Sequence, residues 1–456
     1  MGIDPGFEDR PWSHLEWTMG ILAELFEAET GRPCLPYRTP EELSANFDLA
    51  IPEQGKTAEE LYALARQVVL ATPRTAGRTF FNQLFGGRVV PALAGDILAS
   101  ALNNSVHTYK AAGLQVLVER SLISELARQV GYPHGEGILT PGGSLSNLVA
   151  MMLARNEALP DVRDEGLRGA RLTAYASDQS HYSLRKNAGI LGTGRKLVRI
   201  VPTDDAGHFH PGALEEQIRR DQDEGCTPFF VNATAGTTVL GAFDPLPPLV
   251  EICRRYGLWL HVDAAYGGSV ALSPRFRHLL EGCGDADSLT WDLHKMMGVP
   301  VGASAILLRE EGLLARHLSE TASYLFQSEE DAFNPGLRSP QCGRRNDALK
   351  CWMAFQALGR AGYARRVERQ FELARWAAER VKRDPKLELV LEPESINVCF
   401  RVSGRPAREV CSELDRRGLA KVAWGAFRDQ EFVRLVCVNA DLTEADLEAF
   451  FQAVLE

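Results

Sequence analysis

The sequence predicts an α/β protein in which a mostly parallel sheet is covered by helices and followed by a smaller α+β domain. Six short apolar segments between residues 172 and 309 alternate with stretches of helical length, which is typical of parallel strands joined by helices. The first 95 residues are mostly helical in pattern, and a long amphipathic stretch after Arg345 leads into four further apolar segments. We therefore expect three parts: a helical segment (1–95), a large domain (96–345) and a small C-terminal domain (346–456).

The individual elements follow from this alternation. The expected strands of the large domain are LTAYAS (172–177), KLVRIVP (196–202), PFFVNAT (228–234), LWLHVDAA (258–265), SLTWDLH (288–294) and SAILLR (304–309). Expected helices include residues 57–71, 211–225, 245–257 and, as one long element, 346–381. The small domain should add strands at 387–393, 396–402, 421–427 and 433–438. Ligands of such sheets bind at the carboxyl ends of the strands, where this chain places His181, Thr234, Asp263 and Lys295.

Composition narrows the possible partners and the compartment. The net charge of −10 disfavours nucleic acid and anionic membranes as partners, so an acidic ligand would need a local cation. Nine scattered cysteines without a C-x-x-C pair favour a reducing compartment and argue against a zinc module or a disulfide framework. We expect no metal site. A polar N-terminus and the lack of an apolar run of about 18 residues predict a cytoplasmic protein.

A glycine-rich turn at Gly142-Gly143-Ser144 opens an expected helix. Free N–H groups at a helix start, together with the helix dipole, bind phosphate well. An ordinary helix cap after a tight turn explains the same residues about equally well. The spacing matches neither G-x-G-x-x-G nor G-x-x-x-x-G-K-[ST], which makes a dinucleotide or P-loop site a weak reading.

Three further residues have functional and structural explanations. Asp263 ends an apolar strand and needs a cationic partner if it is buried, which a protonated pyridine nitrogen would provide; otherwise it caps a loop. His181 could stack on a cofactor ring, although a structural histidine is the default. Lys295 follows His294 in an apolar setting and could form a Schiff base with a carbonyl cofactor, or start a surface loop. All three residues follow predicted strands, and their order along the chain favours cofactor binding over the structural explanations.

The chain resembles the group II pyridoxal-phosphate decarboxylases, which act on glutamate, cysteine sulfinate and aspartate. The matching stretches are FFNQLFGG (from Phe80), GILTPGGSLSN (Gly137), SDQSHYS (Ser177), FVNATAGTTVLGAFDPL (Phe230), LWLHVDAAYGG (Leu258), TWDLHKMMG (Thr290), ASYLFQ (Ala322), QCGRR (Gln341) and EPESINVCF (Glu392). The resemblance implies fold type I, the aspartate-aminotransferase-like fold of pyridoxal-phosphate enzymes. It also implies a homodimer with active sites between protomers, in which residues 1–95 pack.

The resemblance also implies roles for individual residues. Lys295 would hold pyridoxal 5'-phosphate as an internal aldimine, and the reaction would pass through an external aldimine and a quinonoid. The other implied cofactor-binding residues are Gly143, Ser144 and His294 at the phosphate, His181 on the ring, Asp263 at its nitrogen, and Thr234 and Ala265 along it. The implied catalytic residues are Lys295, His181 and Asp263. The implied substrate-binding residues are Gln83, Leu84, Phe85 and Arg434, of which Gln83 and Arg434 would hold the distal acid.

Two departures from the family pattern carry information. The family usually has Asn-Pro before the His-Lys pair, where this chain has Asp292-Leu293.

The second departure is the loop between ASYLFQ and QCGRR, which is short. It has Phe333 where family members carry a tyrosine that donates the final proton. Tyr324 or a group of the partner chain is then left as the proton donor. We expect Ser328–Pro340 to close as a lid. Decarboxylation of another amino acid, or diversion to transamination or oxidative deamination, is the alternative activity; a non-catalytic homologue is disfavoured by intact Lys295, Asp263 and His181.

Overall fold

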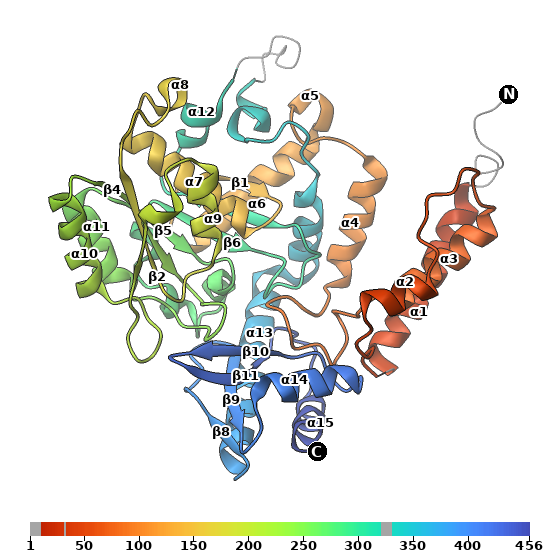
Figure 1. The fold of residues 1–456 in the computed structure, drawn as a ribbon. Coiled ribbons are helices and arrows are strands. Elements are labelled where there is room, and N and C mark those ends of the chain that lie inside the picture. Colours follow the sequence, from red (N-terminus) through yellow and green to blue (C-terminus); the bar gives the residue numbers. More distant parts are fainter. Residues whose placement is uncertain (1–10, 32, 321–330) are drawn as a thin grey trace. The chain divides into compact units, whose positions relative to one another are not determined.

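The computed structural model describes residues 11–31, 33–320 and 331–456 (Figure 1). The chain divides into two compact units. The large unit comprises Arg88–Ala378 and Leu391–Val398. The small unit comprises Met1–Gly87, Glu379–Val390 and Cys399–Glu456. The three-part division expected from the sequence stays a prediction.

A seven-stranded sheet with the order β1-β7-β6-β5-β4-β2-β3 forms the centre of the large unit. Its strands are β1 (Glu136–Thr140), β2 (Leu172–Ser177), β3 (Val198–Val201), β4 (Thr227–Thr234), β5 (Trp259–Asp263), β6 (Ser288–Asp292) and β7 (Ser304–Leu308). Strands β2 to β6 pair in parallel, and β7 is antiparallel to β6 and β1. All six strands expected between residues 172 and 309 are present, which confirms the mostly parallel sheet.

Strand β1 is an element that the sequence did not predict. It contains Gly137, which weakens the local strand signal. A Cβ atom at Gly137 would collide with the carbonyl oxygen of Ile306 on β7. The close approach of two backbones therefore explains the glycine, and pairing with β7 explains the strand.

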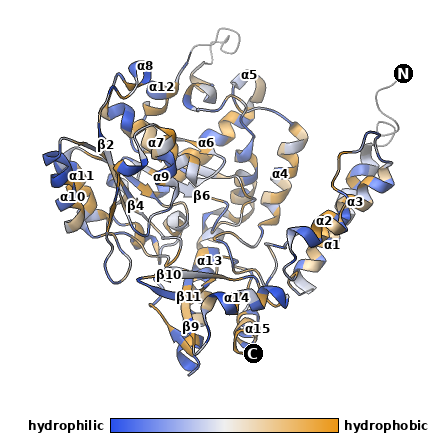
Figure 2. Cartoon of the chain, viewed as in Figure 1, coloured by the Kyte–Doolittle hydropathy of each residue, from blue (hydrophilic) through white to orange (hydrophobic). Residues whose placement is uncertain are grey.

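Helices cover the sheet, as expected for parallel strands. They are α4 (Val90–Leu102), α5 (Tyr109–Ala112), α6 (Leu114–Gln129), α7 (Gly143–Ala158), α8 (Val162–Glu165), α9 (Ser183–Ile190), α10 (Pro211–Asp223), α11 (Leu246–Tyr256) and α12 (Leu313–Leu318). Helix α7 packs against β4 to β7, and its buried Val149, Met151 and Leu153 join the core formed with β2, β4 and β7. In Figure 2, α10 and α11 carry both hydrophilic and hydrophobic residues.

The expected long C-terminal helix is α13 (Asp347–Arg383), but it is not one continuous helix. Gly359 interrupts it with a φ of 64° and a ψ of 176°, so two helices meet at this residue. Positive φ is accessible to glycine at little cost, which makes Gly359 a natural place for the break. The amphipathic pattern on both sides concealed it in the sequence.

The small unit contains three N-terminal helices and a four-stranded sheet. The helices are α1 (Pro11–Gly31), α2 (Pro40–Asn46) and α3 (Ala58–Ala71), with α14 (Ala407–Arg416) and α15 (Glu444–Leu455) near the C-terminus. The sheet has the order β10-β11-β9-β8, with β8 (Leu387–Leu389), β9 (Asn397–Val402), β10 (Ala423–Phe427) and β11 (Gln430–Val436). Capping boxes begin α2, α3 and α15. No helix among residues 11–31, 33–320 and 331–456 combines the length and apolarity needed to cross a bilayer.

An ion-pair network in the large unit gives a prediction about stability. The imidazole of His208 lies 2.8 Å from Glu394 Oε2 and 3.3 Å from Asp204 Oδ2, and the hydrogen bond to Glu394 raises the pKa of His208 to about 9. This stabilisation is fully present below pH 6.5, the ordinary value, and is lost as pH rises through about 9. We expect His208→Gln to lower the free energy of unfolding by about 1–2 kcal/mol at pH 7.

Urea unfolding of both proteins between pH 6 and 10 checks this expectation. The difference between wild type and variant should shrink as the pH approaches 10. A difference that is independent of pH would show that packing, rather than charge, connects His208 to Glu394.

Candidate active site

A cavity of about 420 Å³ lies in the large unit, at the carboxyl ends of β4, β5 and β6. The strand register brings these ends together, because Thr234 pairs with Asp263 and Asp263 pairs with Thr290. The cavity brings together all eight residues predicted to bind the cofactor: Gly143, Ser144, His181, Thr234, Asp263, Ala265, His294 and Lys295. The size falls within the usual range of about 300–1,000 Å³ for ligand sites.

The first turn of α7 contributes backbone N–H groups to this cavity. The helix begins at Gly143, and Gly142 before it provides no side-chain cap, so the first N–H groups are available to an anion. A Cβ atom at Gly143 would lie 2.9 Å from Asp292 Oδ2 and 3.1 Å from Ala265 Cβ. The glycine therefore keeps open a narrow space at the start of the helix.

Asp263 is buried and held by a chain of side-chain hydrogen bonds. Asn147 Nδ2 donates to Asp263 Oδ2 at 2.7 Å, which leaves Asn147 Oδ1 facing His261 Nε2 at 3.1 Å. Burial lowers the pKa of His261 to about 4, so this imidazole is neutral and carries its proton on Nε2. Its Nδ1 then accepts from Ser288, 2.8 Å away, whose Oγ accepts from Trp259 Nε1 at 2.8 Å. In this series of hydrogen bonds, each donor therefore lies on the side away from Asp263 and each acceptor on the side nearer to it.

His181 lines the cavity with its ring half-buried. Its Nδ1 accepts a hydrogen bond from the backbone N–H of Ser183 at 3.3 Å, and Ser183 Oγ lies 2.9 Å from the same atom. Burial lowers the pKa of His181, so the neutral ring carries its proton on Nε2. An uncharged, oriented imidazole is suited to stacking on a flat ring.

Lys295 and His294 share a carboxylate partner, Asp292. Lys295 Nζ lies 3.3 Å and His294 Nε2 3.6 Å from Asp292 Oδ2, while His294 Nδ1 lies 2.8 Å from the carbonyl oxygen of Ala303 and donates to it. Lys295 has a side chain only 20% exposed, so the surface-loop explanation of this lysine is wrong. Asp292 is the cavity residue that sequence reasoning missed as a functional group. Its signal was a carboxylate at the end of an apolar strand.

The four predicted substrate-binding residues lie in the small unit. Arg434 is on β11, an interior strand of its sheet, and is 9% exposed. Its Nη2 donates to the carbonyl oxygen of Asn82 at 2.6 Å. Next to Asn82, Gln83 is exposed, Leu84 buried and Phe85 half-buried. The guanidinium thus holds the segment that contains Gln83.

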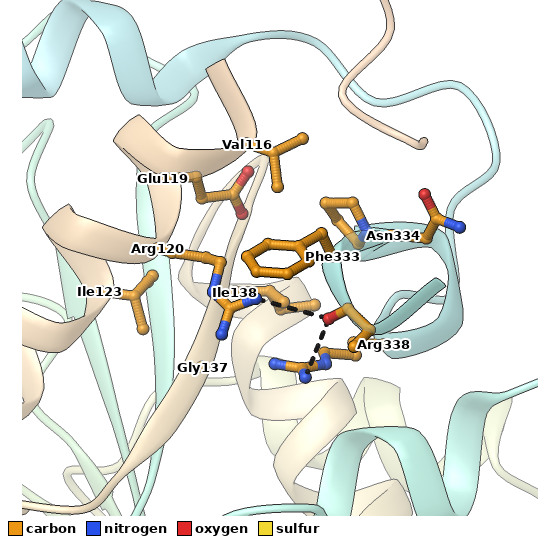
Figure 3. A pocket seen from close by; sticks show the side chains of 11 residues that line it. Val116, Glu119, Arg120, Ile123, Gly137, Ile138, Phe333, Asn334 and Arg338 are labelled. Atoms are coloured by element: carbon orange, nitrogen blue, oxygen red, sulfur yellow. Dashed lines mark hydrogen bonds between the residues drawn. The ribbon is translucent and has the colours of Figure 1, made fainter. Parts of the chain in front are cut away.

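The expected lid is described only in part. Tyr324 and the first three residues of the Ser328–Pro340 segment lie outside the described residues, and the lid stays a prediction. The described part contains two 3-10 helices, Asp331–Phe333 and Pro335–Arg338. The Phe333 ring lies 4.5 Å from the Arg120 guanidinium carbon, and Arg120 and Arg338 both donate to the Ala332 carbonyl at 3.4 Å (Figure 3). Phe333 is thus held on α6 and does not line the 420 Å³ cavity.

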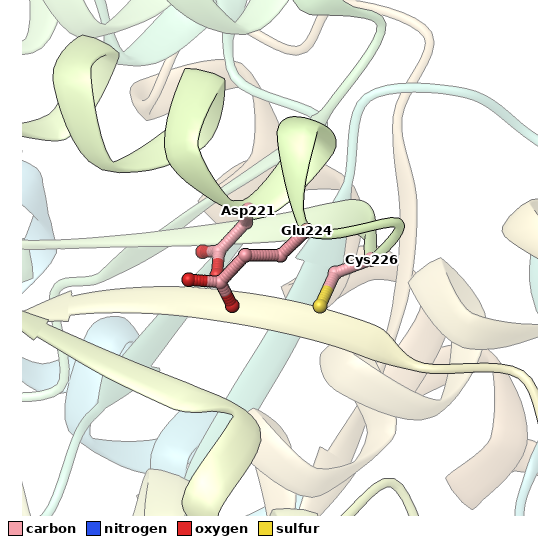
Figure 4. A group of neighbouring side chains, drawn as sticks. All are labelled: Asp221, Glu224 and Cys226. Carbon is pink, nitrogen blue, oxygen red and sulfur yellow. The ribbon is translucent and has the colours of Figure 1, made fainter.

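A second group of polar side chains, Asp221, Glu224 and Cys226, has donor atoms close enough to hold a metal ion (Figure 4). Asp221 is fully buried, and its Oδ1 accepts from Arg199 Nε at 2.8 Å. Its Oδ2 accepts from the Tyr175 hydroxyl at 2.9 Å. Both carboxylate oxygens are therefore bonded to protein donors, and we assign this cluster a structural role.

Comparisons with known proteins agree on one family. The pyridoxal-dependent decarboxylase conserved domain matches residues 40–403. The chain is 44% identical over 369 residues to cysteine sulfinic acid decarboxylase of Mus musculus, covering 80% of this chain and 75% of the relative. It is 42% identical over 369 residues to the acidic amino acid decarboxylase GADL1 of Mus musculus, covering 80% of this chain and 67% of that relative.

Solved structures show the same similarity in three dimensions. The crystal structure of mouse CSAD in apo form superposes with a TM-score of 0.93 at 37% identity, covering 97% of this chain and 98% of that one. The crystal structure of Oryza sativa TDC with PLP and tryptamine superposes with a TM-score of 0.92 at 26% identity, covering 100% of this chain and 98% of that one. The predicted fold type is therefore confirmed.

Proposed function

The chain belongs to the pyridoxal-dependent decarboxylase family, and from this premise we propose that it decarboxylates a small acidic L-amino acid to the amine and CO2. It is an amino acid decarboxylase whose cofactor is pyridoxal phosphate. The candidate substrates are cysteine sulfinate, aspartate and glutamate. The observation that carries the proposal is the single cavity that collects Lys295, Asp263, His181 and the start of α7.

The residues of the cavity fit the cofactor. The uncapped first turn of α7, with Gly143 and Ser144, would hold its phosphate together with His294. Asp263 would hold the proton on the ring nitrogen, since its buried carboxylate lines the cavity and is held in place by Asn147. His181 would cover one face of the ring, and Thr234 and Ala265 would line it. Lys295 would bind the cofactor covalently through its amine.

The chemistry divides between cofactor and chain. When bound, the cofactor supplies an electron-withdrawing ring that stabilises the negative charge left on Cα after CO2 departs. Asp263 maintains the positive charge at the ring nitrogen on which this property depends. The neutral His181 adds no charge to the ring face. Lys295 Nζ lies 3.3 Å from Asp292 Oδ2, and an amine forms such a covalent bond only when it is uncharged.

Acidic substrates are favoured by the relatives and by one buried cation. Both relatives reported above are named for decarboxylation of acidic amino acids. A protein with a net charge of −10 attracts such a substrate only through a local positive charge. Arg434 is a buried guanidinium beside Gln83, and a guanidinium binds a carboxylate or sulfinate with two parallel hydrogen bonds. We therefore propose Gln83 and Arg434, with Leu84 and Phe85, as the substrate-binding group.

Substitution of Arg434 tests this assignment. We expect Arg434→Met to raise KM for the acidic substrate at least tenfold, about 1.4 kcal/mol, and to leave cofactor binding intact. Arg434→Lys should restore the activity only partly, because an ammonium lacks the planar fork. Since Arg434 also holds the Asn82 carbonyl, the measured quantity is the ratio of kcat/KM for acidic and uncharged amino acids. An unchanged ratio would mean that Arg434 only supports the backbone.

Phe333 motivates a second candidate activity on the same fold. The family tyrosine that donates the final proton is replaced by Phe333, whose ring packs on Arg120 and not in the cavity. Diversion to transamination or oxidative deamination follows if no other group donates that proton. Decarboxylation of a different amino acid is a separate alternative that does not depend on the proton donor. Product analysis separates the activities: amine and CO2 support decarboxylation, whereas an aldehyde or ketone supports the alternative.

We also propose a cytoplasmic homodimer without nucleic-acid or membrane partners. Helix α1 leaves Trp12, Leu15 and Met19 at least half exposed, and apolar patches of this kind mark interaction surfaces. This supports packing of the N-terminal helices against a second copy. All nine cysteines are free, as in a reducing compartment. The molar mass of the holoenzyme in solution tests the dimer, and a monomer with full activity would exclude a shared active site.

A further inference from the structure

Asp292 is a buried carboxylate in the cavity that the proposed reaction does not require. It ends β6, is 2% exposed, and lines the cavity between Gly143 and Lys295. Its Oδ1 is buried without a hydrogen-bond partner. A buried carboxylate oxygen without a donor is costly, so the position of Asp292 calls for a functional explanation.

The carboxylate lies against the phosphate-binding end of α7. A Cβ atom at Gly143 would be 2.9 Å from Oδ2 and 3.0 Å from Oδ1 of Asp292. Both oxygens therefore face the first residue of the helix, whose free N–H groups would receive the phosphate. Bound cofactor would bring a second anion to the same place, and like charges in a poorly solvated site repel.

The charged groups around Asp292 change when the cofactor binds. Its neighbours are Lys295 Nζ at 3.3 Å and His294 Nε2 at 3.6 Å. His181 and Asp263 line the same cavity, and Asp292 acts electrostatically on His181. The cofactor would use the Lys295 amine for its covalent bond, and its phosphate would add an anion beside the Asp292 carboxylate.

We propose that Asp292 is a positioning residue whose carboxylate weakens the binding of the cofactor phosphate. This inference rests on the proposed function, because it assumes that pyridoxal phosphate occupies the cavity. Asparagine has the same shape as aspartate without the charge, and the family usually has asparagine here. The chain would thus hold its cofactor less tightly than a relative with asparagine.

Titration of the apoprotein with pyridoxal phosphate tests the proposal without measuring turnover. We expect Asp292→Asn to lower the Kd for pyridoxal phosphate at least tenfold at pH 8. Tryptophan fluorescence and the visible absorbance of the bound cofactor measure this Kd. Asp285→Asn is the matched control, because it removes an exposed carboxylate from the 3-10 helix Cys283–Asp285 and should leave this Kd unchanged.

Phosphate-free pyridoxal and inorganic phosphate identify the cause. Repulsion of the phosphate predicts that Asp292→Asn tightens pyridoxal phosphate and inorganic phosphate but leaves pyridoxal nearly unchanged. Equal tightening of pyridoxal would show that Asp292 acts only through Lys295, and would overturn the proposal. Unchanged or weaker binding of pyridoxal phosphate by a variant that melts like wild type would also overturn it. If wild type binds no pyridoxal phosphate, the proposed function itself fails. If wild type binds it but Asp292→Asn does not tighten the binding, only the proposal about Asp292 fails.

Discussion

Replacement of Lys295 by alanine is expected to abolish CO2 release, with a loss of more than about 10³-fold in kcat, and to remove the visible absorbance of the covalently bound cofactor. The amine of Lys295 lies in the cavity beside Asp292 and near the start of α7. A shorter, unreactive side chain cannot form the covalent bond on which the proposed chemistry depends. The fold should persist, because the side chain is not part of the apolar core.

Steady-state CO2 release and the absorption spectrum of the purified variant check this expectation. Lys186→Ala provides a matched control, since Lys186 is an exposed lysine on α9 of the same unit and does not line the cavity. It should retain activity and spectrum. Substantial CO2 release by Lys295→Ala would show that another group carries the cofactor, and would overturn the assignment.

Asp263→Asn is expected to retain cofactor but to lose most activity, on the order of 10²–10³-fold in kcat, similar to the loss of one charge-stabilising group elsewhere. Asn147 Nδ2 donates to Asp263 Oδ2, so an asparagine at 263 would turn its own oxygen toward Asn147. Its amide group would then present a donor, where a protonated ring nitrogen needs an acceptor. The ring would lose its positive charge and stabilise the developing negative charge less well.

Comparison with another buried carboxylate separates this effect from instability. Asp221→Asn alters a fully buried aspartate bonded to Arg199 and Tyr175, outside the cavity. It should lower the melting temperature with little change in kcat, whereas Asp263→Asn should lower kcat at a temperature where both are folded. A nearly normal kcat for Asp263→Asn would show that Asp263 only caps a loop and does not act on the cofactor.

Much of the cavity was predictable because its residues follow a local rule. Short apolar segments separated by helical stretches predict parallel strands, and parallel strands place their carboxyl ends at one edge of the sheet. Residues that follow those segments, such as Asp263 and Lys295, must then lie near one another. Gly143 is added by the turn that opens α7. The sequence alone therefore determined the fold class and the order of the strands along the chain, and the family resemblance identified eight of the residues that line the cavity.

Only the tertiary structure decided which hydrogen bonds hold these residues in place and which charged groups lie next to them. The contact of Asn147 with Asp263 spans 116 residues, and that of Arg434 with Asn82 spans 352. The position of Asp292 against Gly143, the pairing of β1 with β7 and the break at Gly359 likewise have no clear signature in a short window. Periodicity shows which face of an element is buried, whereas partners are selected by packing between distant elements. For this reason the residues of the site could be read from the sequence, but the hydrogen bonds and charges that set their chemistry could not.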